Sequence, residues 1–181
     1  SKRGSNEIDD SKLKTDLVDS IKNRAENVMI TDLVRNDLAR CCKTGSILVE
    51  ELFGVYTYPN VHQMISTISG ELNIGISFTD IIRNTFPMGS MTGAPKIEAM
   101  KLIDQYEKSN RGFYSGSIGY LKPNGDFDFN VIIRTIIYNS KKRYLSLHSG
   151  GAITSDSSAE EELNESLLKA DALKNILVKK F

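Results

Sequence analysis

Two acidic clusters, near opposite ends of the chain, contain the residues best suited to chemistry. The first, residues 24–37, includes Glu26, and the second, residues 160–169, includes Glu162 and Glu165. Carboxylates that share one face of a helix belong either to a buried ion-pair network or to a site for a hard cation such as Mg²⁺. The residues alone leave both interpretations open, and the choice between them decides what kind of protein this is.

The second cluster predicts a helix with carboxylates beside its buried face. On a helix, Glu162, Glu165 and Lys169 lie within about 60° of one another. Beside them runs an apolar stripe made of Ala159, Leu163, Ala170, Leu173 and Leu177. The simplest interpretation is a solvated flank with a Glu165–Lys169 pair, which contributes only about 0.2–0.5 kcal/mol. The alternative is a ligand or metal site at the edge of the core.

In the first cluster, polar residues fall among apolar ones. Glu26 shares a helix face with Asn23, and a solvated flank is again the simplest interpretation. Asp37, however, lies between Leu33 and Leu38, so we expect a buried polar group there that needs a partner. An ion-pair network and a ligand site fit this pattern equally well.

Three further segments could bind an anionic ligand. The loop Gly89–Lys96 leads into a helix start, where free backbone N–H groups attract anions, although its spacing is not that of a phosphate loop. Arg134 lies in the apolar segment 129–137, which predicts a strand, so its guanidinium needs a carboxylate partner from the protein or from a ligand. Gly150 and Gly151 follow a strand and allow either a close ligand approach or a tight turn.

Composition and charge exclude several classes of protein. Basic and acidic residues number 23 each, so no net field favours a polyanion such as nucleic acid. No apolar run approaches the roughly 20 residues that span a membrane, and the first residues lack a secretion signal, so we expect a cytoplasmic protein. The cysteines, Cys41 and Cys42, are adjacent and should be ordinary thiols. With only two histidines, a zinc set is not expected, and any metal site should consist of oxygen ligands.

Hydrophobic periodicity predicts an α+β protein with antiparallel sheets flanked by helices. The expected helices cover residues 13–42, 78–85, 95–107 and 158–179. The expected strands lie within residues 46–71, 113–121, 127–138 and 143–147, joined by tight turns. The segregated order of helices and hairpins argues against a doubly wound parallel sheet.

Five segments, in this order, resemble the chorismate-utilising enzyme family, which includes anthranilate synthase component I, aminodeoxychorismate synthase component I, and isochorismate and salicylate synthases. The segments are 24–38, 92–96, 112–120, 133–135 and 162–169. They cover nearly the whole chain, and five ordered motifs make a ligand site the better interpretation of the acidic clusters. The resemblance implies the C-terminal half of a chorismate-binding α/β sandwich.

The resemblance also implies roles for individual residues. Glu26, Glu162 and Glu165 would hold Mg²⁺, which would bind the ring carboxylate of chorismate. The residues that would contact the substrate are Tyr114, Arg134, Gly150, Gly151, Ala152, Lys169 and Thr92. Gln63, the candidate catalytic residue, occupies a position that is histidine in anthranilate synthases, and a glutamine there can still form hydrogen bonds. Asn23 stands where many members carry glutamate.

Within the family, segments 24–37 and 86–96 together with Gln63 favour the aminodeoxychorismate synthase component I branch. The implied reaction replaces the 4-hydroxyl of chorismate by ammonia from a glutamine amidotransferase partner. It gives 4-amino-4-deoxychorismate for para-aminobenzoate and folate synthesis. Anthranilate synthase is the alternative enzyme, and a non-catalytic ligand-binding module is the alternative of a different class.

The resemblance further leads us to expect that residues 1–181 are the C-terminal part of one larger catalytic domain. In the family, a motif ending in Gly-Thr precedes the position of Ser1. Its third residue, lysine in aminodeoxychorismate synthases and alanine in anthranilate synthases, would be the covalent nucleophile, and a catalytic glutamate lies further upstream. The 181 residues alone should therefore not turn over chorismate, and product formation by them would contradict this expectation.

Overall fold

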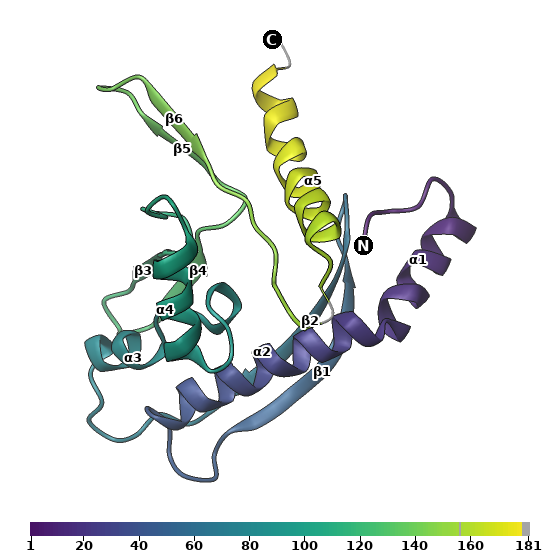
Figure 1. Cartoon of the computed structure of the whole chain (residues 1–181). Coiled ribbons are helices and arrows are strands. Elements are labelled where there is room, and N and C mark those ends of the chain that lie inside the picture. Colours follow the sequence, from purple (N-terminus) through teal and green to yellow (C-terminus); the bar gives the residue numbers. More distant parts are fainter. Residues whose placement is uncertain (156, 179–181) are drawn as a thin grey trace. The chain divides into compact units, whose positions relative to one another are not determined.

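The computed structural model of the chain describes residues 1–155 and 157–178. It divides into two compact units, Ser1–Tyr106 and Glu107–Phe181 (Figure 1), and each is described by itself. That both belong to one domain stays a prediction. Within the described part of the chain, no helix combines the length and apolar character needed to cross a membrane.

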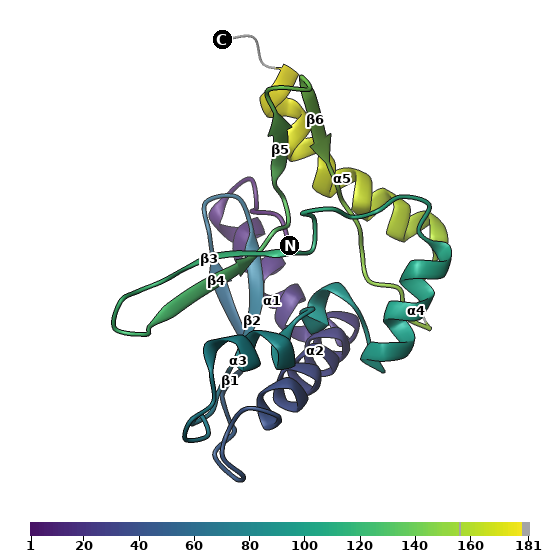
Figure 2. The same cartoon turned by 90° about the vertical axis from the view of Figure 1, so that its left-hand side faces the viewer.

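The first unit combines helices with one β-hairpin. Its helices are α1 (Glu7–Asp19), α2 (Ile21–Ala39), α3 (Phe78–Thr85) and α4 (Lys96–Tyr106), with a 3-10 turn η1 at Gly89–Met91. Its strands β1 (Leu48–Thr57) and β2 (His62–Ser69) pair antiparallel. Helix α2 lies along this hairpin in both views (Figures 1 and 2). The strands expected within residues 46–71 are confirmed by this hairpin.

The single helix expected over residues 13–42 is wrong, because two helices meet there at Ser20. Ser20 has an extended backbone (ψ 109°), which ends α1, and its hydroxyl accepts a hydrogen bond from the Asn23 N–H at 3.3 Å, which caps α2. The apolar period continues across the junction, so the periodicity alone concealed it. A serine cap of this kind stabilises a helix start by about 1 kcal/mol.

The core of the first unit centres on the adjacent cysteines. Cys41 and Cys42 are buried and unbridged, as predicted, and they pack with Ile81. Leu38, Ile47 and Ile76 surround this group. Burial raises the pKa of the Cys41 thiol, and the neighbouring Cys42 thiol raises it further. Two thiols therefore serve here as small apolar side chains.

A polar network fastens α1 to the hairpin. The Asp10 carboxylate accepts bonds from Arg3 at 2.7 and 2.8 Å and from the Gly4 N–H at 2.7 Å, and it contacts the ring of the buried His62 at 3.0 Å. The other ring nitrogen of His62 contacts the Thr57 hydroxyl at 3.0 Å. The hydrogen bonds from Arg3 and Gly4 hold the pKa of Asp10 well below its usual range.

An Asp10→Asn substitution should therefore make stability less dependent on pH under acidic conditions. A carboxylate with a depressed pKa in the folded state stabilises the fold above its unfolded pKa of about 4, and this stabilisation is lost as the pH falls through the folded pKa. The variant should be less stable than the wild type at neutral pH, and the difference should shrink below about pH 4. Melting temperatures measured across that range test this. Asp16→Asn, an exposed position on α1, is the control, and equal behaviour of the two variants would contradict the prediction.

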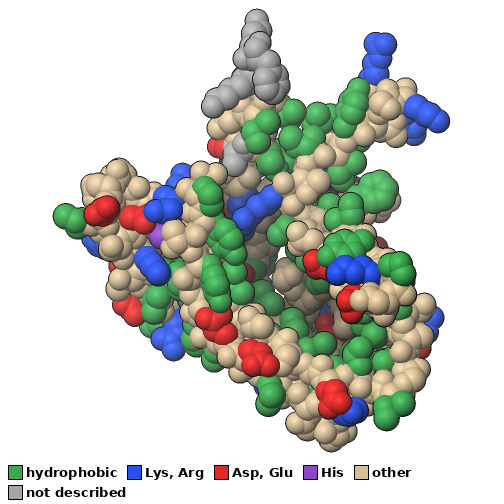
Figure 3. Space-filling model, turned by 180° about the vertical axis from the view of Figure 1, so that it is seen from behind, with side chains coloured by type: hydrophobic (Ala, Val, Ile, Leu, Met, Phe, Trp, Pro, Cys, Tyr) green, Lys and Arg blue, Asp and Glu red, His purple; other side chains and the backbone are tan. Residues whose placement is uncertain are grey.

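The second unit contains two hairpins and the last helix. Strand β3 (Ser117–Leu121) pairs with β4 (Phe127–Val131), and β5 (Ile136–Asn139) pairs with β6 (Tyr144–Leu147), both antiparallel as predicted. The strand expected over residues 113–121 begins only at Ser117, because residues 113–116 form a turn in which the Gly116 N–H donates to the Phe113 carbonyl at 3.0 Å. Helix α5 spans Ala159–Val178; Lys179, the expected end, lies outside the described residues. Basic side chains stand at the tip of the β5–β6 hairpin, at the upper right of Figure 3.

The continuous strand expected over 127–138 is wrong, because the chain leaves the sheet around Arg134. Arg134 has a left-handed backbone (φ 49°), and residues 132–135, between β4 and β5, belong to no strand. A non-glycine residue in this conformation costs about 1–3 kcal/mol. The Arg134 side chain is consequently exposed and not buried within a sheet.

The apolar stripe expected on the last helix is only partly confirmed. Ala170 is buried, but Leu163 and Leu177 are 59% and 49% exposed. The buried position in the first turns is instead Glu162, which is 6% exposed. A buried carboxylate requires hydrogen bonds or a cation nearby, so this position points to a polar site on α5.

Candidate active site

The first unit carries three of the residues proposed from the sequence. Glu26 lies on α2 and is half-buried. Gln63 lies on β2, exposed, and its amide nitrogen donates to the Met64 carbonyl at 3.4 Å. Thr92 follows η1, and its hydroxyl lies 3.2 and 3.3 Å from two carbonyl oxygens of its own loop. The functional roles of all three stay predictions.

A buried ion pair joins the Thr92 loop to α2. Lys96 Nζ lies 2.5 Å from Asp37 Oδ2, and the two side chains are 12% and 6% exposed. Gly89 packs directly against α2, since a Cβ at this glycine would lie 2.8 Å from the Cβ of Leu33. The expectation that Asp37 is a buried group with a partner is confirmed. The pair therefore fixes the loop that carries Thr92 against the helix that carries Glu26.

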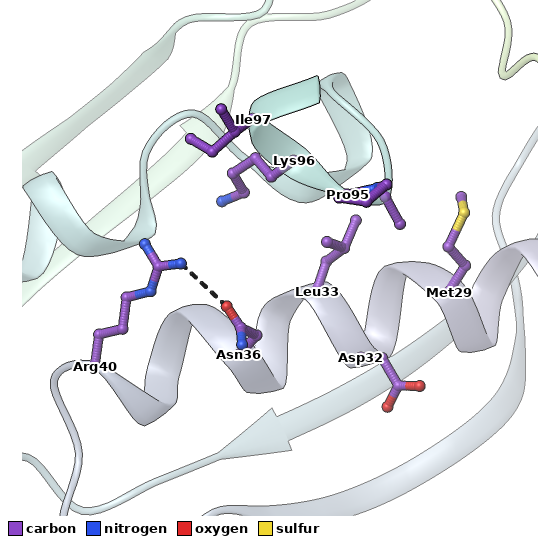
Figure 4. Close-up of a pocket in the computed structure, with 9 residues that line it drawn as sticks. Met29, Asp32, Leu33, Asn36, Arg40, Pro95, Lys96 and Ile97 are labelled. Atoms are coloured by element: carbon purple, nitrogen blue, oxygen red, sulfur yellow. Dashed lines mark hydrogen bonds between the residues drawn. The ribbon is translucent and has the colours of Figure 1, made fainter. Parts of the chain in front are cut away.

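Helix α2 and the start of α4 also line a pocket of about 480 Å³. In Figure 4, Met29 and Leu33 on α2 face Pro95 and Ile97 at the start of α4. Elsewhere in the lining, Arg40 donates to the Asn36 side chain at 3.2 Å. None of the residues proposed from the sequence as catalytic, substrate-binding or metal-binding lines this pocket. The candidate chemistry is therefore not located in it.

In the second unit, Tyr114 and Arg134 come from the same end of the β3–β4 hairpin. The ladder pairs Ser117 with Val131, and backbone bonds continue it, with the Ser115 N–H donating to the Ile132 carbonyl at 3.0 Å. Tyr114 and Arg134 follow directly beyond these last bonds, one on each side of the hairpin. Residues that are 20 apart in the sequence are thus brought to one edge.

The segment Gly150–Ala152 lies along α5. Ser149 Oγ donates to the Ser166 carbonyl at 2.8 Å, and Lys169 Nζ lies 3.3 Å from the Gly150 carbonyl oxygen and 2.7 Å from Glu165 Oε1. The Tyr114 hydroxyl is close as well, 3.4 Å from where a Cβ of Gly150 would stand. The structure therefore brings together Tyr114, Gly150 and Lys169, three of the residues that the sequence proposed.

Ser157 connects the glycine segment to Glu162. Its hydroxyl donates to Glu162 Oε1 at 2.9 Å and accepts from the Thr154 N–H at 3.0 Å. Gly151 lies beside the same carboxylate, since a Cβ there would be 2.8 Å from Glu162 Oε2. Ser157 could not be recognised from the sequence, because a serine before a helix indicates only a cap.

Glu162 and Glu165 provide oxygen ligands that suit Mg²⁺. They lie three residues apart on α5, and one is buried while the other is 47% exposed. Within residues 1–155 and 157–178, no group of three or more His, Cys, Asp or Glu side chains is arranged to hold a metal. Mg²⁺ does not require such a group, because it usually takes one or two carboxylates together with water and ligand oxygens.

Comparison with known proteins shows the class to which the chain belongs. The sequence model of the family described as chorismate binding enzyme matches residues 1–175. The chain therefore belongs to the family of chorismate binding enzymes.

Particular relatives narrow the comparison. The chloroplastic aminodeoxychorismate synthase of Arabidopsis thaliana is 47% identical over 97% of this chain and 19% of its own length. Anthranilate synthase component 1 of Aquifex aeolicus is 41% identical over 95% of this chain and 34% of its own length. The crystal structure of anthranilate synthase component I from Streptococcus pneumoniae TIGR4 matches with a TM-score of 0.81 and 36% identity, over 91% of this chain and 37% of that chain.

The structural match confirms the predicted α+β, chorismate-binding fold. The chain spans 19% to 37% of the length of these three relatives. Its activity, substrates and partners are therefore proposed below and not inferred directly from the names of these relatives.

Proposed function

We propose that the protein acts in the Mg²⁺-dependent amination of chorismate, in which ammonia replaces the 4-hydroxyl to give 4-amino-4-deoxychorismate and water. This reaction leads to para-aminobenzoate and folate. The observation that carries the proposal is the 47% identity to an aminodeoxychorismate synthase over 97% of the chain. Ammonia comes from a glutamine amidotransferase partner or domain, in keeping with relatives that are named as a component 1.

The residues of the second unit that the sequence proposed can bind the carboxylates of chorismate. Lys169 and the backbone of Gly150–Ala152 bind carboxylate oxygens of chorismate, together with the Tyr114 hydroxyl and the Arg134 guanidinium. The exposed, left-handed position of Arg134 supports a ligand role, because strained backbone is retained mainly at functional sites.

Glu162 and Glu165, both on α5, would hold Mg²⁺, which would neutralise the ring carboxylate of chorismate. The metal-binding role of Glu26, in the first unit, stays a prediction. The protein residues around Glu162 and Glu165 keep the carboxylates oriented. Ser157 fixes one oxygen of Glu162, and Lys169 fixes Glu165. Such supporting bonds commonly change metal affinity by about 10–100-fold when removed.

The product identifies the reaction. The full-length protein is incubated with chorismate, ¹⁵N-labelled ammonium and MgCl₂, with and without EDTA. The products are then separated by chromatography, and their masses are measured by mass spectrometry. We expect ¹⁵N in 4-amino-4-deoxychorismate, only with Mg²⁺. Fluorescent anthranilate with pyruvate release would instead support the anthranilate synthase alternative, which the Aquifex relative makes the second candidate. No consumption of chorismate would contradict both.

A Gly151→Ala substitution tests the Glu162 carboxylate without removing it. The added methyl group would stand 2.8 Å from Glu162 Oε2, so the carboxylate must move away from its position. We expect the apparent affinity for Mg²⁺ to fall about tenfold, as measured from the Mg²⁺ dependence of the rate. Gly150→Ala is the matched control, because its methyl group meets only an ordinary contact of 3.4 Å. Equal Mg²⁺ dependence in both variants would show that Glu162 is not a ligand.

A further inference from the structure

Two side chains without a role in the proposed function, His148 and Arg111, lie against the Tyr114 ring. The ring stacks on His148 with centroids 5.3 Å apart and an interplanar angle of 25°. The Arg111 guanidinium carbon lies 6.0 Å from the Tyr114 centroid. Stacking and a cation near an aromatic ring are both attractive, so the two side chains restrict the orientation of the ring.

Arg111 is itself fixed. Its Nε donates to Glu107 Oε2 at 2.8 Å, a second nitrogen bonds the other carboxylate oxygen, and Nη1 lies 3.3 Å from the Ser115 hydroxyl. The bond to Arg111 lowers the pKa of Glu107, and the bond to Glu107 raises the pKa of Arg111. The pair therefore stays charged across the ordinary pH range, and the bidentate geometry limits rotation of the guanidinium.

The restricted ring aims its hydroxyl at one place. That hydroxyl stands 3.4 Å from the Cβ position of Gly150, whose carbonyl oxygen lies 3.3 Å from Lys169 Nζ. The phenol of Tyr114 and the ammonium of Lys169 are thus presented to the same short backbone segment, which suits one carboxylate of a ligand.

We propose that Arg111 and His148 are positioning residues, which orient Tyr114 so that its hydroxyl meets a carboxylate of the substrate beside Gly150. They act through the Tyr114 ring and not on the reacting atoms. The identity of the substrate as chorismate rests on the proposed function, whereas the positioning of the ring does not. Holding a hydroxyl in place before the ligand arrives reduces the ordering cost of binding.

The test uses substitutions that separate ring stacking from other properties of the side chain. In the full-length protein, His148→Ala should raise the KM for chorismate about tenfold, since small displacements of a positioned group weaken binding strongly. The kcat should stay within about twofold, as a binding role requires. His148→Phe should restore the KM because it keeps an aromatic face. Arg111→Met should raise KM similarly, and Arg111→Lys should restore it in part.

A double-mutant cycle shows whether His148 acts through the Tyr114 hydroxyl. Tyr114→Phe keeps the ring and removes the hydroxyl. If the proposal holds, His148→Ala has no further effect on KM in the Tyr114→Phe background, because there is no hydroxyl left to orient. Independent, additive effects would overturn it, and so would an unchanged KM in His148→Ala alone. Melting temperatures confirm that each variant is folded.

A ligand-free readout separates this proposal from the proposed function. With ¹³Cζ-labelled tyrosine, the Tyr114 resonance is assigned through Tyr114→Phe. It should shift in His148→Ala, which loses the stacked ring, and stay close to its place in His148→Phe. A resonance that does not move in His148→Ala would overturn the positioning role. If it moves while the product is not 4-amino-4-deoxychorismate, the proposed function fails and the positioning role stands.

Discussion

Replacing Lys96 with methionine is expected to lower the free energy of unfolding by about 3–5 kcal/mol. The substitution keeps the length of the side chain but leaves the Asp37 carboxylate, which is 6% exposed, without its ammonium partner. A buried charge that loses its partner retains the full cost of its removal from water. Urea denaturation followed by circular dichroism measures the effect.

An exposed pair of the same kind provides the control. Lys101 contacts Glu98 at 2.7 Å on α4, and the two side chains are 66% and 60% exposed. Lys101→Met should therefore cost less than about 1 kcal/mol. The double variant Asp37→Leu, Lys96→Met should recover much of the loss, because it removes both charges. If Lys96→Met costs no more than Lys101→Met, the pair does not stabilise the loop.

The second large effect is expected from Glu165→Gln. If Glu165 is a Mg²⁺ ligand, the neutral amide should lower kcat/KM at least about 100-fold, and higher Mg²⁺ concentrations should recover part of it. Glu162→Gln should lower kcat/KM in the same way, and higher Mg²⁺ concentrations should again recover part of the loss. The rate with chorismate and ammonium, measured against Mg²⁺ concentration in the full-length protein, gives both quantities.

Helix α5 offers a control for the Glu165→Gln and Glu162→Gln variants in its first turn. Glu161 is exposed beside Glu162 and has no role in the proposal. Glu161→Gln should leave kcat/KM and the Mg²⁺ dependence unchanged within about twofold. A loss in Glu165→Gln that no Mg²⁺ concentration recovers would point to substrate binding through Lys169 in place of metal binding.

The local elements followed from the sequence wherever one short-range pattern decides them. The short α3 helix matches the expected residues 78–85, and the hairpins at Pro123-Asn124-Gly125 and residues 139–142 form where turn residues separate alternating strands. Ser20 and Arg134 were missed for a common reason. Each breaks an element through its own backbone angles, and an apolar period that continues past it does not report those angles.

The side-chain partners of buried polar and aromatic residues could not be predicted from hydrophobic periodicity. Asp37 was recognisable as a buried polar group, but its partner Lys96 stands 59 positions away, and only tertiary packing selects it. The same holds for His62 and Asp10, and for the stacking of His148 on Tyr114. Family motifs indicated Tyr114, Gly150 and Lys169 as a group, and geometry alone added Arg111, His148 and Ser157.

The adjacent core cysteines allow local unfolding of the first unit to be measured through their reaction with a thiol reagent. Cys41 is fully buried and its thiol has a raised pKa, so a thiol-alkylating reagent cannot react with it in the closed state, where the reactive thiolate is scarce. Alkylation then proceeds only while local unfolding exposes the core cluster of Cys41, Cys42 and Ile81. The alkylation rate, measured by mass spectrometry, gives the free energy of that opening in the way that amide exchange does, and no cysteine has to be introduced for it.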